Sequence, residues 1–268
     1  MNDFLKKAGL FLCLVVLLVF SGCHLNDFQT SAEDIQVSVN VGRAVTGLNI
    51  HLTVVNIADA KDSHECTFTI ENGVASGSVT GLTVGATYHL SMVIKNNDFI
   101  FATSSNDVTV KAGKNNVSMA LERTTMEEII AAFESASKGN KAQFVLKSDV
   151  DWTQCASLGS MFGNPPEKPA DFTLDLNGFT IYYNVPKEYD FRNPMIFFGN
   201  VGEGARFTVK NGKVNGKNVS ESSFISARTD DEIGQVYNQY IFAEDLEIQG
   251  FDGSVFYMLG GRNQSTTY

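Results

Sequence analysis

Basic residues are scarce in this 268-residue chain. Twenty lysines and arginines stand against 30 aspartates and glutamates, which gives a formal net charge of −10. A chain this acidic offers no basic patch for the phosphate backbone of a nucleic acid, so we expect no nucleic-acid partner. The same charge repels polyanions unless calcium or a local basic groove intervenes.

Histidine and cysteine are also scarce. The last of the four histidines is His89, so the C-terminal half has no histidine to serve as a base, a metal ligand or part of a Ser-His-Asp triad. Two of the four cysteines lie in the first 23 residues, and Cys66 and Cys155 remain, far apart and without a CxxC spacing. We expect both to be free, buried thiols, and we expect no metal and no resident cofactor.

The one long apolar run lies at the N-terminus. Met1–Lys7 is basic, Ala8–Phe20 is an apolar run of 13 residues, and two small residues precede Cys23. This order is typical of a secretory signal, because a bilayer-spanning helix needs about 20 apolar residues. The small-small-Cys ending resembles the lipobox of bacterial lipoproteins. That resemblance implies that residues 1–22 are removed and that Cys23 becomes a lipid anchor in the membrane. An ordinary signal peptide with a chance cysteine is the alternative.

Residues 23–34 are polar and aperiodic, and we interpret them as a tether. From residue 35 to residue 122, apolar and polar residues alternate, as in Leu48–Val54, with turn signals between the runs. Seven or eight such runs predict a small antiparallel β-sandwich. The segment Asn72–Tyr88 resembles the strand–loop–strand segment of immunoglobulin-like and carboxypeptidase-regulatory-like domains.

Residues 123–268 follow a different pattern. Thr125 and Glu128 fit a capping box, apolar residues then recur at helical spacing, and Gly139 ends the predicted helix. The spacing predicts that a strand, Ala142–Leu146, comes next. A helix that leads into strands rich in Gly and Asn resembles the N-terminal cap of a right-handed parallel β-helix of the pectate-lyase type.

Similar segments begin at Phe172, Phe207 and Phe242, 35 residues apart each time. A fixed period in this range is the signature of stacked repeats, so we expect about three coils with these three side chains stacked inside. The fold class is therefore all-β, a sandwich followed by a parallel β-helix with one capping helix. A second antiparallel sandwich is the alternative. No polar closing element follows the third coil, so we expect a truncated chain or a partner that covers this end.

No motif here is specific for catalysis, and no catalytic residue is assigned. Asp175, Lys210 and Asp245 sit at comparable offsets in the repeats, so they could lie together on successive coils and bind a ligand. Outward charges on a solvated face are the alternative. Trp152 could stack on a sugar ring or pack under the helix. The acidic run 230–232 offers oxygen ligands that make calcium binding possible.

The order of the segments resembles that of cell-surface lipoproteins in Bacteroidetes glycan-utilisation systems. The resemblance implies a lipid-anchored protein at the outer membrane or cell surface of a Gram-negative bacterium. It also implies a carbohydrate-binding or adhesion module, with polysaccharide and other outer-membrane glycan-uptake proteins as partners. A polysaccharide lyase or hydrolase of the β-helix type is the alternative function, and a purely structural surface component is a third.

Overall fold

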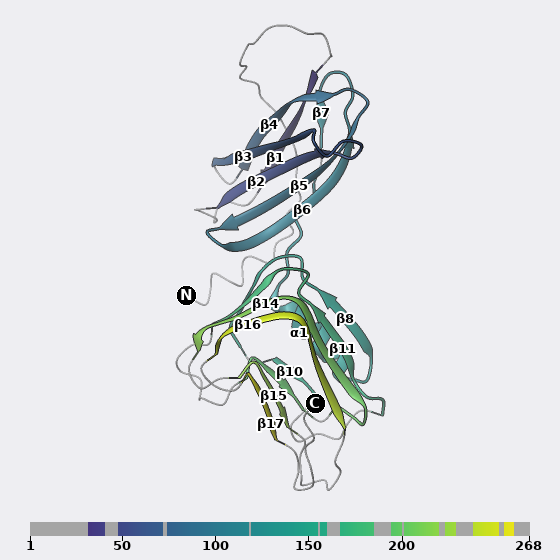
Figure 1. Ribbon diagram of the computed structural model, residues 1–268, viewed down its shortest axis with the longest axis vertical. Coiled ribbons are helices and arrows are strands. Elements are labelled where there is room, and N and C mark those ends of the chain that lie inside the picture. The colour runs from purple at the N-terminus through teal and green to yellow at the C-terminus, as the bar shows by residue number, and fades with distance from the viewer. Residues whose placement is uncertain are drawn as a thin grey trace. The chain divides into compact units, whose positions relative to one another are not determined.

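The structure is a computed structural model (Figure 1). It describes residues 32–40, 48–71, 74–117, 119–154, 156–159, 167–184, 194–199, 201–219, 223–228, 238–251 and 255–259. The expected signal, Cys23 and most of the tether lie outside these ranges. The chain divides into two compact units, Met1–Arg123 and Thr124–Tyr268, one residue later than the expected boundary.

Strands make up most of the described part of unit 1, the first of these units. They follow the order β6-β5-β2-β3-β4-β1-β7 across the sheet. Their bounds are β1 (Ala32–Asn40), β2 (Asn49–Asn56), β3 (Ser63–Glu71), β4 (Val74–Thr83), β5 (Thr87–Asn96), β6 (Phe99–Thr109) and β7 (Asn115–Asn116). Neighbouring strands pair antiparallel. The exception is β1 with β7, which pair in parallel, so the expectation of a wholly antiparallel unit is wrong at this edge.

The predicted alternation in unit 1 is confirmed most clearly in β2 and β5, where buried side chains alternate with more exposed ones. In β2, Ile50, Leu52 and Val54 are buried while His51 is exposed, and His89 is exposed in β5. Strand β3 pairs with β2 in its first half and with β4 at its end, and inward side chains from both groups of strands join one apolar cluster. Cys66 is a free thiol as expected, but it is only half-buried.

Parallel strands form unit 2, the second unit, together with α1 (Met126–Ser137), the one helix among the residues described. The strand bounds are β8 (Lys141–Val145), β9 (Val150–Trp152), β10 (Ala156–Leu158), β11 (Asp171–Asp175), β12 (Thr180–Tyr183), β13 (Ile196–Phe198), β14 (Ala205–Val219), β15 (Ile225–Arg228), β16 (Gln239–Phe251) and β17 (Phe256–Leu259).

The pairings of unit 2 run through three parallel ladders. Ladder 1 is β8, β11 and the first halves of β14 and β16. Ladder 2 is β9, β12 and the second halves of β14 and β16. Ladder 3 is β10, β13, β15 and β17. The chain visits the ladders in turn, and we call each passage through all three a rung. Parallel pairing between the repeats is confirmed, and an antiparallel second sandwich is wrong.

The described residues hold four rungs, one more than the expected three, because β8, β9 and β10 form a rung before Phe172. Phe172 and Phe207 are register partners, with ring centroids 6.0 Å apart and planes 14° from parallel, so their predicted stacking is confirmed. The stacking predicted for Phe242 is wrong. Ile241 is the register partner of Phe207, and Phe242 is 38% exposed. A one-residue slip turns every side chain to the other face of a strand.

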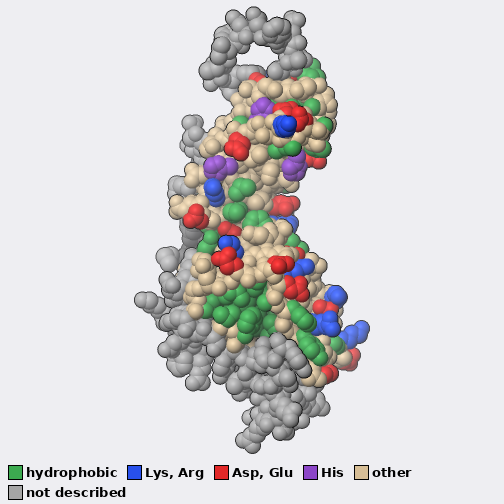
Figure 2. Space-filling model, viewed as in Figure 1, with side chains coloured by type: hydrophobic (Ala, Val, Ile, Leu, Met, Phe, Trp, Pro, Cys, Tyr) green, Lys and Arg blue, Asp and Glu red, His purple; other side chains and the backbone are tan. Residues whose placement is uncertain are grey.

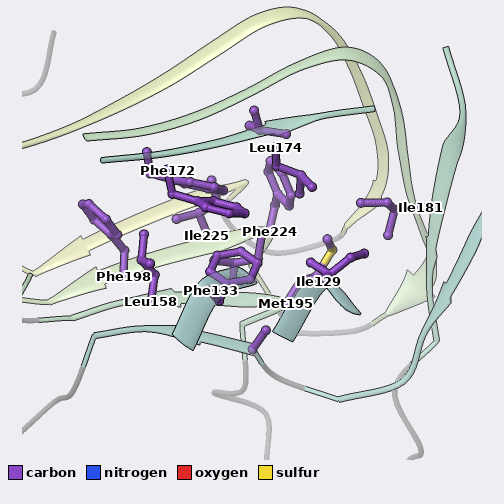
Figure 3. Packing of buried hydrophobic residues seen from close by; sticks show 14 of the residues in the cluster. Ile129, Phe133, Leu158, Phe172, Leu174, Ile181, Met195, Phe198, Phe224 and Ile225 are labelled. Carbon is purple, nitrogen blue, oxygen red and sulfur yellow. The ribbon is translucent and has the colours of Figure 1, made fainter. Parts of the chain in front are cut away.

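The capping box of α1 is present as predicted. The Glu128 amide donates to Thr125 Oγ1 (3.3 Å), and the Thr125 amide donates to Glu128 Oε2 (2.9 Å). The apolar face of the helix lies on the core of unit 2, where the Phe133 ring is 4.6 Å from that of Phe172 and 5.9 Å from that of Phe207 (Figure 3). The helix therefore closes one end of the stack of rungs.

Candidate functional site

The outer face of ladder 1 presents polar and aromatic side chains in aligned columns. In β11, Phe172 and Leu174 are buried, so the residues between and beside them point outward. The register then aligns three outward columns across rungs two to four. These columns are Asp171, Arg206 and Tyr240; Thr173, Thr208 and Phe242; and Asp175, Lys210 and Glu244.

Two of the predicted ligand residues meet on this face. Lys210 Nζ lies 3.7 Å from Asp175 Oδ2, and both side chains are partly exposed. The other carboxylate oxygen of Asp175 accepts from the Asn177 amide and from Asn211 Nδ2, both at 3.0 Å. These contacts fix the carboxylate in place and leave Lys210 with an opposite charge beside it.

Asp245 does not complete the predicted trio. Glu244 is the register partner of Lys210, because β16 pairs 34 residues after β14 rather than 35. Asp245 instead sits at the bend of β16 with φ 47, as Asn211 does at the bend of β14 with φ 60. Asn and Asp tolerate this left-handed conformation better than most residues. Asp245 therefore occupies a bend with left-handed backbone geometry, outside the column that contains Asp175 and Lys210.

Trp152 lies inside the core of unit 2. The side chain is 0% exposed, and its ring meets that of Phe133 edge to face, with centroids 6.4 Å apart and planes at 89°. A ring that stacks on a sugar must offer a free face. The predicted ligand role of Trp152 is therefore wrong in this conformation, and packing under the helix is confirmed.

A pair of aromatic rings that the sequence analysis did not select lies at the fourth rung. Tyr240 is 44% exposed and Phe242 is 38% exposed. Their ring centroids are 6.4 Å apart and their planes are within 16° of parallel, while the Arg206 guanidinium lies 6.0 Å from the Phe242 centroid. The sequence Tyr240-Ile241-Phe242 indicates such a pair, because residues two apart on a strand share a face.

Unit 1 contains a polar cluster centred on Asp62. Tyr88, whose side chain is fully buried, donates its hydroxyl to Asp62 Oδ2 (2.5 Å), and Asn56 Nδ2 donates to the same oxygen (3.0 Å). His64 Nε2 lies 3.0 Å from Asp62 Oδ1. The Tyr88 hydrogen bond is the largest cause of a pKa for Asp62 below its usual value. The cluster ties the β2–β3 connection to β5.

Within the described ranges, no group of three or more His, Cys, Asp or Glu side chains is placed to hold a metal ion. The acidic run 230–232, expected as a possible calcium site, lies outside those ranges, as does Cys155.

Comparisons with protein-family models, with curated proteins and with solved structures return no match. Over the part of the chain that the structure describes, no helix is long and apolar enough to cross a membrane.

Proposed function

We propose that this protein is a lipid-anchored cell-surface module that binds carbohydrate. In this proposal Cys23 carries the lipid, unit 1 is an immunoglobulin-like sandwich that acts as a spacer, and unit 2 is a parallel β-helix that binds the glycan. The shared core around β3, which pairs with two groups of strands, supports the sandwich. The repeated passage through three parallel ladders supports the β-helix.

The observation that carries the binding function is the aromatic pair at the fourth rung. Tyr240 and Phe242 present nearly parallel rings along one strand, with Arg206 beside them. The apolar face of a sugar ring stacks on an aromatic ring, while an arginine donates several hydrogen bonds to sugar oxygens. A short run of sugar units lying along β16 would use both kinds of contact.

The test is affinity electrophoresis of the purified protein in gels that contain pectate, alginate, chondroitin or a neutral glucan. At least one polysaccharide should retard the protein, and the double variant Tyr240→Ala/Phe242→Ala should lose the retardation. Val145→Ala is the matched control, because Val145 is an exposed apolar residue on the same ladder at the first rung. The proposal fails if no polysaccharide retards the protein, or if the double variant is retarded as strongly as the control.

The alternative function, a lyase or hydrolase, has one observation in its favour, the meeting of Lys210 and Asp175. The last histidine of the chain is His89, so unit 2 offers no histidine base, and Lys210 Nζ lies in an ion pair with Asp175 Oδ2 at 3.7 Å. We therefore expect no β-elimination of pectate, alginate or chondroitin, with or without calcium, as measured by the ultraviolet absorbance of the unsaturated product. A calcium-dependent rise that Lys210→Ala abolishes would favour the enzyme over the binding module.

Anchoring and partners complete the proposal. An outer-membrane or cell-surface location, with other glycan-uptake proteins as neighbours, agrees with the lipobox-like end of the leader. A module of this kind would hold polysaccharide close to the membrane for those neighbours.

A further inference from the structure

The aromatic pair of the fourth rung has a carboxylate at each end along β16. Glu244 follows Phe242 by two residues, so it lies on the same outward face of the strand, and its side chain is exposed. At the start of β16, Glu203 Oε2 accepts from the Asn238 amide (2.8 Å) and Glu203 Oε1 accepts from Asn238 Nδ2 (2.7 Å). Asn238 stands two residues before Tyr240. The two rings therefore lie between two negatively charged side chains.

One cation lies beside the rings, the Arg206 guanidinium, which is 6.0 Å from the Phe242 centroid. Lys210 is the register partner of Glu244, but its ammonium pairs with Asp175 on the second rung. Glu244 itself forms no ion pair with another described residue. Two carboxylates and one guanidinium leave an excess of negative charge around the rings, as in the chain as a whole.

Elsewhere in unit 2, acidic and basic side chains are paired between neighbouring strands. Lys141 Nζ lies 3.1 Å from Asp171 Oδ2, and Lys213 Nζ lies 2.7 Å from Glu247 Oε2. Figure 2 shows acidic and basic side chains close together over the part of unit 2 that Figure 1 labels β8 and β11. Among the described residues, the outward columns of ladder 1 therefore hold no surplus of positive charge that could attract an acidic polysaccharide.

The groups around the rings suit an uncharged sugar. A carboxylate accepts hydrogen bonds from sugar hydroxyls, and such charge-assisted bonds are stronger than bonds between neutral groups. A uronate or sulfated sugar would instead bring a second negative charge close to Glu203 or Glu244. Salt screens charges that are more than about 8 Å apart at physiological ionic strength, so it would not remove this repulsion at contact distance.

We propose that the aromatic pair binds an uncharged polysaccharide, and that Glu203 and Glu244 make the site selective against acidic ones. The inference rests on the proposed carbohydrate-binding function and adds the class of glycan. The sugar units stack on Tyr240 and Phe242, and their hydroxyls donate to the carboxylates at the two ends of the pair. Arg206 donates to sugar oxygens from the neighbouring strand.

The test compares polysaccharides that share a backbone and differ in charge. Hydroxyethyl cellulose is uncharged and carboxymethyl cellulose is acidic, and the neutral glucan, pectate and alginate of the first test extend the series. Affinity electrophoresis of the full chain, referred to its mobility in a gel without polysaccharide, gives an affinity for each. We expect an uncharged polysaccharide to bind at least about tenfold more tightly than any acidic one.

Two double variants test the role of the carboxylates. Glu203→Gln/Glu244→Gln removes both charges beside the rings and keeps the size of the side chains. Glu134→Gln/Glu167→Gln removes the same charge from two exposed residues outside ladder 1, on α1 and before β11. The preference for uncharged over acidic polysaccharide should fall about fivefold or more in the first variant, and change less than about twofold in the second. Circular dichroism checks that both variants are folded.

Three results would overturn the inference. Retardation by acidic polysaccharides as strong as that by uncharged ones would remove the selectivity and leave the proposed carbohydrate-binding function intact. Equal changes of the preference in the two double variants would remove the role of Glu203 and Glu244, with the same consequence. Absence of retardation in every gel would contradict the proposed function itself, and the inference with it.

Discussion

At the scale of single residues, the Asp62 carboxylate is a polar group held by three side chains. It accepts from a fully buried tyrosine hydroxyl and from an asparagine amide, and a histidine ring lies against its second oxygen. A buried hydroxyl bonded to a carboxylate stabilises the folded state more than an ordinary hydrogen bond. These bonds also favour the ionised carboxylate, so they link the stability of unit 1 to pH.

We expect Tyr88→Phe to lower the free energy of unfolding of unit 1 by about 1 to 3 kcal/mol at pH 7. The pKa of Asp62 is lowered in the folded state, so its contribution is present above the unfolded pKa of about 3.9 and is lost as the pH falls through the folded value. The difference between Tyr88→Phe and the unchanged protein should therefore shrink in acid. Urea unfolding followed by circular dichroism at several pH values measures it. Tyr240→Phe is the control, and an equal loss there would contradict the prediction.

A second prediction concerns substitution of Trp152. A packing role predicts a loss of stability, whereas a sugar-stacking role predicts a loss of polysaccharide binding. We expect Trp152→Phe to lower the thermal midpoint of unit 2, since the smaller ring leaves part of a fully buried site empty. Retardation by polysaccharide should stay unchanged in the folded variant. Loss of retardation with an unchanged midpoint would restore the sugar-stacking role.

At the scale of elements, local sequence patterns predicted the helix cap and the strand alternation. They did not predict which residues of β14 and β16 pair with one another. The capping box depends on four consecutive residues, and the alternation in β2 depends on neighbours two apart, so both are visible in the sequence. The slip of β16 depends on the total number of residues that the chain uses from β14 through β15 to β16, which no local pattern records. As a result, Ile241 took the inward position expected for Phe242, and Glu244 took the place expected for Asp245.

The register predicts different effects for two phenylalanines that look equivalent in the sequence. Phe207→Ala should cost about 3 to 5 kcal/mol, because it removes a fully buried ring that touches both Phe172 and Phe133. Phe242→Ala should cost less than about 1 kcal/mol, because the ring is partly exposed on the outer face. Chemical unfolding followed by Trp152 fluorescence compares them. Similar losses for both variants would mean that the register described for β16 is incorrect.

At the scale of the whole molecule, sequence reasoning separated the two units and assigned the strand-rich character of each. It also predicted the parallel pairing of unit 2 from the spacing of Phe172 and Phe207. It missed the first rung, because β9 and β10 are only three residues each and leave no visible repeat. It missed the aromatic pair for the same reason that it misplaced Phe242, since exposure depends on register.

The proposed anchor is tested on the whole protein. Cys23→Ser should move the protein from the membrane fraction to the soluble fraction, because a sulfur-linked lipid no longer forms. Cys66→Ser is the control, since it removes a thiol from a folded unit and leaves the leader unchanged. Fractionation followed by immunoblotting measures both variants. A Cys23→Ser protein that remains in washed membranes would show that lipidation of this cysteine is not the anchor.

The succession of rungs also has a consequence for the order in which unit 2 folds. Each strand meets its partner one rung earlier in the chain, so every added rung closes a loop of similar size. The entropy lost on closing a loop rises only slowly with its length, so no late step carries a much larger cost than an early one. The helix gives the first rungs a surface on which to assemble, through Phe133 against Phe172. Unit 2 can therefore fold in the direction of synthesis, one rung at a time, with its N-terminal end serving as the nucleus.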